Sequence, residues 1–323
     1  MEGSRLKELR SKKAFKAIQN KSGILLGLII LMAFFSIQAN NFLSQRNLLN
    51  ILLQSSISAT VALGMTVVIT GGGIDLSVGS VMAISSITAA SFMAGGMHMA
   101  LAIVLALLIA VCFGVVNGFI ISRTTIAPFI VTLGMQSIAR GIVYIICNGV
   151  PITQLPDEFH IFGGGKLADV IPLPVLFMLF FAVIAYITLH KSKFGRHVFA
   201  VGSNENTAYL SGVDVVKIKQ CMYMLCSAFA AVAGIIYASR VISGQPNAGE
   251  NYETDAIAAT VIGGTSMAGG QGSIVGTVLG ALIMGILSNG LNMLSINYYY
   301  QRIAIGIVII GAVYLDSIRS KRR

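Results

Sequence analysis

Charged residues are scarce in this sequence. Only 11% of its 323 residues are Asp, Glu, Lys or Arg, 55% are hydrophobic, and the mean hydropathy is +0.83. A soluble domain carries about a quarter charged residues, so this composition excludes one. No charge stands from Leu76 to Ser122 or from Ala256 to Gln301, and each run is long enough for two membrane spans of about 20 residues. The sequence therefore predicts an all-α, polytopic membrane protein.

Motifs of common enzyme sites are also lacking. The sequence has no G-x-x-x-x-G-K-[ST] loop for a nucleotide, no H-E-x-x-H and no G-x-S-x-G, and its four histidines are scattered. We therefore expect no catalytic residues, no metal site and no cofactor held by this chain. Carboxylates in the middle of the apolar runs, which proton-coupled carriers use, are missing as well. A transporter with this sequence would take its energy from a partner.

Cysteines are few, and none forms a C-x-x-C pair. Cys112, Cys147, Cys221 and Cys226 lie in or beside apolar runs, so we interpret them as small core residues rather than as a disulfide framework. The first apolar run, Gly23–Ile37, follows a basic segment but has no A-x-A cleavage site. We interpret it as an uncleaved first span.

The net charge of +10 is concentrated in a few segments. Basic residues crowd residues 1–21, the loop 191–219 and the tail 317–323. Positive loops on the cytoplasmic side orient membrane proteins, so this pattern favours a multi-pass protein with both termini in the cytoplasm. It also argues against a partner made of nucleic acid, which would need a basic folded surface.

The apolar runs define the organisation of the chain. We expect about ten spans, with eight possible if two apolar segments are re-entrant. They form a single transmembrane domain over 22–316, between a basic N-terminal segment 1–21 and a basic tail 317–323. The expected spans cover residues 22–38, 48–70, 77–95, 98–121, 127–148, 171–190, 219–241, 255–269, 273–290 and 302–316.

A glycine-rich break separates two apolar runs at Thr70–Ser80. Each glycine in a helix costs about 1 kcal/mol relative to Ala, so Gly71-Gly72-Gly73 predicts a turn or an unwound segment. Asp75 and Ser77 stand where the N-cap of the next helix would stand. In lipid such backbone is tolerated where it is buried in protein or faces a water-filled cavity, so it is a candidate wall of a polar path. An ordinary tight loop outside the bilayer fits these residues equally well.

A second glycine cluster at Gly263–Ser273 echoes the first. Thr265, Ser266 and Gln271 add hydroxyls and an amide without charge, and such groups can hydrogen-bond a neutral polyol. Just beyond the cluster, Gly272, Gly276 and Gly280 repeat every four residues on one helix face. Small-xxx-small faces let helices approach closely, so packing is the first interpretation, and a gating or dimer contact is the other.

Several polar residues lie within the expected spans. Arg140 is the one basic residue deep in a span, with Gln136 one turn before it, and it is expected to pair with Asp75 or a backbone carbonyl. A structural clamp and a substrate contact are both open for it. The full set of candidate residues for a translocation path is Gln54, Ser55, Gly72, Gly73, Asp75, Ser77, Gln136, Arg140, Thr265, Ser266 and Asn289.

The basic loop 191–219 contains a short expected helix. Asn204 can cap it and Gly212 can end it. A short amphipathic helix in such a loop suggests a docking element for a soluble cytoplasmic partner, although a solvated loop that only orients the chain is the alternative.

Four long motifs, taken in order, resemble the ribose-type permeases of bacterial ABC importers. The resemblance covers about Asn41 to Tyr314. The motifs are GMTVVITGGGIDLSVGS (Gly64 to Ser80), PFIVTLGMQSIARG (Pro128 to Gly141), GRHVFAVGSNENTAYLSGVDV (Gly195 to Val215) and DAIAATVIGGTSMAGGQGSIVGT (Asp255 to Thr277).

This resemblance implies the ABC importer permease fold and a subunit that transports a monosaccharide, with ribose as the leading candidate. It implies three partners besides membrane lipid: a second copy of the chain, a cytoplasmic ATPase with two nucleotide-binding domains that binds the ATP, and an extracytoplasmic sugar-binding protein. The coupling segment to the ATPase maps onto Asn204, Glu205, Ala208, Leu210, Ser211 and Gly212. An ion-coupled secondary sugar transporter is the first alternative and a membrane-embedded enzyme the second.

Overall fold

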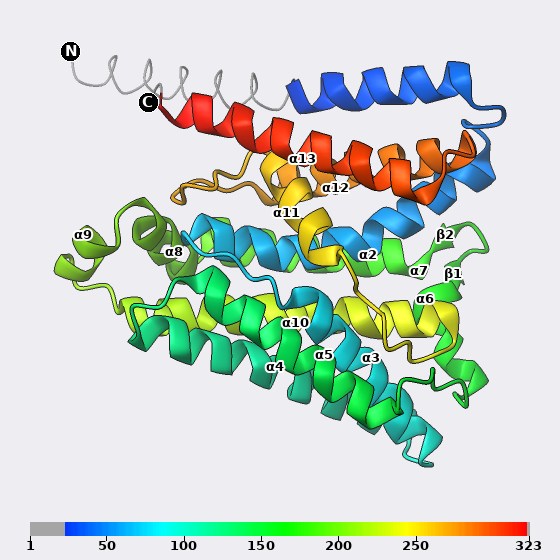
Figure 1. Cartoon of the computed structure of the whole chain (residues 1–323), viewed down its shortest axis with the longest axis horizontal. Coiled ribbons are helices and arrows are strands. Elements are labelled where there is room, and N and C mark those ends of the chain that lie inside the picture. Colours follow the sequence, from blue (N-terminus) through cyan, green and yellow to red (C-terminus); the bar gives the residue numbers. More distant parts are fainter. Residues whose placement is uncertain (1–22, 322–323) are drawn as a thin grey trace.

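The structure is a computed structural model that describes residues 23–321. The predicted basic segment 1–21 and the last two residues of the basic tail lie outside the described residues. Most long helices lie roughly along one common direction (Figure 1). Helices α8 and α9 lie at one end of the bundle, and the short strands β1 and β2 lie with α6 at the opposite end (Figure 1). We call these ends the α9 end and the hairpin end.

Helices account for nearly all regular structure. An unlabelled helix covers Gly23–Gln38. The other elements are α2 (Gln45–Thr70), α3 (Val78–Ala94), α4 (Met99–Arg123), α5 (Pro128–Cys147), η1 (Asp157–His160), α6 (Ile161–Gly164), β1 (Lys166–Leu167), β2 (Ile171–Pro172), α7 (Leu173–Tyr186), η2 (Ile187–Lys191), α8 (Lys193–Ser203), α9 (Glu205–Leu210), α10 (Val215–Val241), α11 (Tyr252–Ile262), α12 (Ile274–Met293) and α13 (Tyr298–Lys321). Strands β1 and β2 form a small antiparallel pair.

A helix occupies each segment that the sequence analysis assigned to a span, but the helices differ in length. In the described part of the chain, seven are long and apolar enough to cross a membrane: α2, α4, α5, α7 with η2, α10, α12 and α13. Gly23–Gln38 and α3 are apolar but shorter. The prediction of a span over 255–269 is wrong in extent, because α11 has only 11 residues and ends at Ile262. Such a helix is about 16 Å long, roughly half the hydrocarbon thickness.

Helices α2, α3 and α10 form the centre of the bundle. Helix α10 packs against α4, α3 and α2, and long stretches of α2, α3 and α10 are buried. Glycines allow the close approach: a Cβ on Gly64 of α2 would lie 2.9 Å from the Cα of Cys226, and one on Gly118 of α4 would lie 2.7 Å from the Cα of Gln220. Small residues thus bring the central helices together, as association in lipid requires. The four cysteines are free.

Candidate functional site

The first glycine break covers residues 71–77, between α2 and α3. Gly72 has φ +83°, a conformation that only glycine adopts readily, and its exposed backbone lies at the α9 end. Ser77 occupies the N-cap position of α3 as predicted, but its side chain makes no capping hydrogen bond. Instead Asp75 Oδ1 accepts hydrogen bonds from the Ser77 N–H at 2.9 Å and from the Ser77 hydroxyl at 2.6 Å. The pair closes a local turn before the helix begins.

Asp75 lies at the centre of a buried polar cluster. The carboxylate is fully buried, and Asn117 of α4 donates its amide to the Ser77 hydroxyl at 2.9 Å. The hydroxyls of Tyr223 and Thr132 both donate to the Ile74 carbonyl. The Cys226 thiol lies near the Asp75 carboxylate, and the second carboxylate oxygen has no hydrogen-bond partner among the described residues. Asp75 is thus a buried carboxylate in the break between two apolar runs, held by the N–H and the hydroxyl of Ser77.

The second break covers residues 263–273 between α11 and α12. Gly264, Gly269 and Gly270 all have positive φ. Thr265 is buried, and its hydroxyl accepts a hydrogen bond from the Ser273 N–H at 3.2 Å. The segment is therefore an ordered loop at the α9 end rather than the end of a span.

Asp316 of α13 holds this loop from outside. Its carboxylate accepts hydrogen bonds from the Ser266 hydroxyl at 3.2 Å and from the Met267 N–H at 3.1 Å. Asp316 is the last residue of the span expected over 302–316, and no role was predicted for it. No local pattern links it to a loop some 50 residues earlier, so only the tertiary fold reveals the contact.

A third irregular segment covers residues 242–251, between the expected spans 219–241 and 255–269. It joins α10 to α11, begins and ends with the left-handed residues Ile242 and Asn251, and includes Gly249 at φ +71°. A Cβ on Gly249 would lie 3.0 Å from the Cα of Gly79, so this segment packs directly on the start of α3. Its Gly244, Pro246 and Gly249 were the available sequence signal.

Arg140 of α5 binds this third segment. Its guanidinium donates to the Pro246 carbonyl at 2.6 Å and to the Ala248 carbonyl at 2.9 Å. Of the two predicted partners, the structure shows backbone carbonyls and not Asp75. Gln136, one turn earlier, donates to Glu253 of α11 at 3.4 Å. The other Glu253 oxygen has no hydrogen-bond partner among the described residues. Gln136, Arg140 and Glu253 are half-buried, and the unpaired Glu253 oxygen lies against Gly79 of α3.

The remaining candidates for the path lie between helices or on the surface. Gln54 is exposed, whereas Ser55 is buried on α2 against Gly285 of α12. Asn289 of α12 and Asn47 of α2 exchange two amide hydrogen bonds of 3.0 Å. Ser55 and Asn289 therefore lie in the contact between α2 and α12, Ser55 by packing and Asn289 by hydrogen bonds. Gln54 lies outside that contact.

Gly276 and Gly280 lie on α12 against neighbouring backbone, whereas Gly272 precedes the helix, so the three do not share one helix face as predicted. A Cβ on Gly276 would lie 2.9 Å from the Gly263 carbonyl carbon, and one on Gly280 would lie 2.9 Å from the Ala259 carbonyl carbon, while Gly272 lies against Thr70. These glycines thus lie against α11 and the end of α2.

The predicted coupling helix is α9. The Asn204 side chain accepts the Thr207 N–H at 2.8 Å and caps the helix, and Glu205 forms an ion pair of 2.7 Å with Lys219. Ala208 is buried, but Leu210 is 83% exposed and the neighbouring Tyr209 is 71% exposed. Ser211 and Gly212 end the helix, Gly212 with φ +82°. The helix therefore points two large apolar side chains into solvent.

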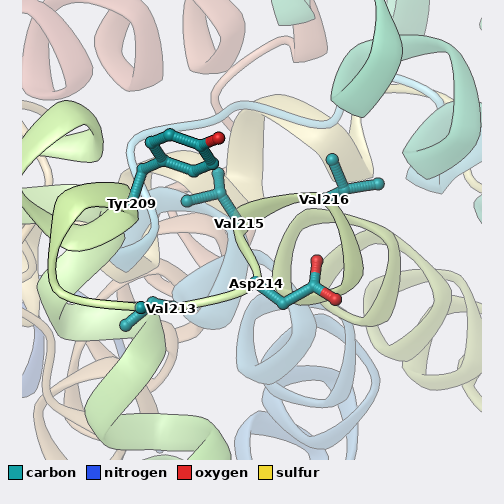
Figure 2. A pocket seen from close by; sticks show the side chains of 6 residues that line it. Tyr209, Val213, Asp214, Val215 and Val216 are labelled. Atoms are coloured by element: carbon teal, nitrogen blue, oxygen red, sulfur yellow. The ribbon is translucent and has the colours of Figure 1, made fainter.

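A cavity of about 400 Å³ lies beside these side chains. Figure 2 shows that the side chains of Tyr209, Val213, Asp214, Val215 and Val216 surround it; Gly212 also lines it. Asp214 caps α10, and the backbone N–H of Lys217, followed by its ammonium group, lowers the pKa of this carboxyl. A lowered pKa keeps the cap charged at neutral pH, so its stabilisation is lost only as the pH falls through that pKa. We call α9 with this cavity the docking surface.

Comparison with known proteins identifies the family. A family model described as "Branched-chain amino acid transport system / permease component" matches residues 47–313. The chain is 44% identical to the ribose import permease protein RbsC of Bacillus subtilis (strain 168), over 99% of this chain and 100% of that protein. It is 36% identical to the D-allose transport system permease protein AlsC of Escherichia coli (strain K12), over 98% and 99% of the two chains.

A solved structure shares the fold. It is an inward-facing conformation of a metal-chelate type ABC transporter, with a TM-score of 0.51, 13% sequence identity and coverage of 92% of this chain and 98% of that chain. The resemblance to ribose-type permeases is confirmed by the sequence matches. The chain belongs to the permease family that the matching model describes, together with the ribose import permeases to which it is 44% identical.

Proposed function

We propose that this chain is the permease subunit of an ATP-driven importer that moves a monosaccharide across the bacterial cytoplasmic membrane. The observation that carries the proposal is the docking surface. Tyr209 and Leu210 expose large apolar side chains on a short helix outside the candidate spans, beside a cavity. Apolar groups clustered on a polar surface mark sites of protein contact, and a separate ATPase is the partner that a permease without a nucleotide-binding loop requires.

Ribose is the proposed substrate. The ribose import permeases are more similar to this chain than the related permeases for allose, xylose or galactose, at 44% identity against 36%, 32% and 35%. The sugar would arrive from an extracytoplasmic binding protein at the hairpin end. There the segments 151–166 and 244–253 lie close together, since Ile152 and Gly244 exchange two backbone hydrogen bonds of 2.9 and 2.8 Å.

The proposed topology has both termini and the docking surface in the cytoplasm, and about ten crossings. The helix Gly23–Gln38 and α3 would complete two of these crossings. Helix α11 would cross together with the irregular segments 242–251 and 263–273. Irregular backbone at membrane depth is tolerated when protein groups satisfy it, as Arg140 satisfies two carbonyls of the first segment.

The path would run between this chain and a second copy. Gln136, Arg140 and Glu253 are polar residues that are only half-buried in one chain, which suits a wall completed by another subunit. The two glycine breaks would change its opening. ATP binding and hydrolysis in the partner would favour one state over the other, so this chain itself performs no covalent chemistry.

Membrane lipid would cover the apolar outside. Most residues of α4 that face away from the bundle are exposed and apolar. A crevice of about 520 Å³ between α4, α6, α7 and α10 is lined only by apolar side chains, among them Leu107, Phe177 and Ile235. Hydrocarbon chains match such a surface.

The direct test is sugar uptake by proteoliposomes that contain this chain and the ATPase of the same importer. Labelled ribose is offered with the binding protein outside and ATP inside. We expect uptake only when all three proteins and ATP are present. Uptake rates of xylose, allose and galactose in the same assay show which sugar is transported best.

Three results would contradict the proposal. Uptake by this chain alone under a proton or sodium gradient would favour the secondary transporter. Chemical conversion of the sugar by this chain alone would favour the membrane-embedded enzyme. A complete system that transports none of the four sugars would reject the monosaccharide substrate.

A further inference from the structure

Three segments that are far apart in the sequence meet at the α9 end. They are the end of α2 with the first glycine break, the end of α8, and the second glycine break. The residues in contact are Thr70, Gly72, Gly202, Gly269 and Gly270, which we call the glycine joint; Gly272 of the second break borders it, against the Thr70 side chain.

The contacts of the glycine joint are made by backbone atoms. The Gly270 N–H donates to the Thr70 carbonyl at 2.8 Å, which ties the second break to the end of α2. A Cβ on Gly202 would lie 2.7 Å from the Gly270 nitrogen and would also collide with the Thr70 carbonyl. A Cβ on Gly269 would lie 2.5 Å from the Gly202 carbonyl oxygen and 3.1 Å from the Gly72 Cα. No side chain separates the three segments, so a shift of one displaces the other two.

The joint is directly attached to the docking surface. Gly202 and Ser203 are the last residues of α8, and the next residue, Asn204, is the N-cap of α9. Only Ser203 therefore stands between the joint and the cap of the exposed helix. Helix α10 follows α9 in the other direction along the chain.

We propose that a movement of α9 shifts both glycine breaks through the backbone contacts of Gly202, Gly269 and Gly270. These contacts would transmit the ATPase's movement to the transport path. The proposal rests on the proposed function, since it needs a partner that moves α9. These glycines are positioning residues and bind no sugar. Close backbone contact keeps α8 and the two glycine breaks in fixed positions relative to one another. A side chain inserted between them should leave binding of the ATPase intact but prevent the path from opening.

The first test is Gly202→Ala in the complete transporter. We expect the ATPase to co-purify with this variant to within about twofold of wild type, because the side chains of the docking surface are unchanged. Ribose uptake should fall on the order of tenfold or more, the size of a typical coupling between sites. ATP hydrolysis should lose its stimulation by the sugar-loaded binding protein. Gly134→Ala is the matched control, since a Cβ at that helical glycine of α5 meets nothing within 4 Å.

The second test does not depend on whether Gly202→Ala folds. A Cβ on Gly272 would collide with the Thr70 hydroxyl, and removing that hydroxyl leaves the Thr70 Cβ 3.1 Å away. Gly272→Ala should therefore lose uptake, and the double variant with Thr70→Ala should recover at least about half of the Thr70→Ala rate, since contacting residues are coupled.

The outcomes separate this proposal from the proposed function. If the wild-type complex takes up ribose and Gly202→Ala takes it up equally well, the role of the joint is wrong but the proposed function stands. The same holds if Thr70→Ala does not relieve the defect of Gly272→Ala. A wild-type complex that does not take up sugar overturns the proposed function and with it this inference.

Discussion

Leu210→Asp is expected to separate the chain from its ATPase. Leu210 is 83% exposed in the isolated chain, and together with Tyr209 it offers the apolar contact that α9 presents. A carboxylate at position 210 would lose its water on binding to the ATPase and would find no hydrogen-bond partner in an apolar contact, so it opposes binding. We expect a loss of about 2 kcal/mol or more in binding free energy, which weakens association about thirtyfold. Co-purification in detergent, followed by titration of the ATPase, measures the loss.

The control for this variant is His197→Ala, an exposed residue of α8 outside the docking surface. Both variants should unfold within about 0.5 kcal/mol of wild type, because both side chains lie in solvent. Leu210→Asp chains that hold the ATPase as tightly as His197→Ala chains would show that α9 is not the docking element.

Arg140→Ala is expected to impair both stability and transport. The variant leaves the buried carbonyls of Pro246 and Ala248 without their donor, at about 1 to 3 kcal/mol for each unpaired group. The segment 242–251 then loses its tie to α5. Thermal unfolding in detergent should show the destabilisation, and ribose uptake should fall on the order of tenfold or more while the ATPase still binds.

Ser137→Ala is the matched control for Arg140→Ala. Ser137 lies on the same helix, is exposed, and donates only to the Leu133 carbonyl of its own helix. Arg140→Lys should recover part of the loss, because one guanidinium nitrogen donates to both carbonyls and an ammonium group can also donate to both, but without the planar shape of the guanidinium. An Arg140→Ala protein with wild-type unfolding and uptake would show that the clamp has no role in either.

Local patterns in the sequence predicted much of the architecture. Charge-free runs located the helices, and Asn204 with Gly212 marked the two ends of α9. These features depend on residues near one another in the chain. The predicted length of α11 was wrong because an apolar run such as Ala256–Ile262 has the same composition whether the helix crosses the membrane fully or only in part.

Contacts between distant segments could not be predicted in the same way. The pairing of Asp316 with Met267 and the burial of Asp75 depend on which helices pack together. The glycine joint is even harder to predict from the sequence, because its contacts are made by backbone atoms. The position of a glycine in the sequence does not indicate which carbonyl packs against it. Only the fold shows that Gly202 meets Thr70.

The central claim is that a separate ATPase drives this chain by binding α9. A photo-crosslinking amino acid placed at Leu210 in the assembled transporter tests it most directly, with one at the exposed Leu167 of the hairpin end as the reference. We predict an adduct with the ATPase from position 210 and none from position 167. An adduct between position 210 and the sugar-binding protein, or an ATPase adduct from position 167 instead, would contradict the claim.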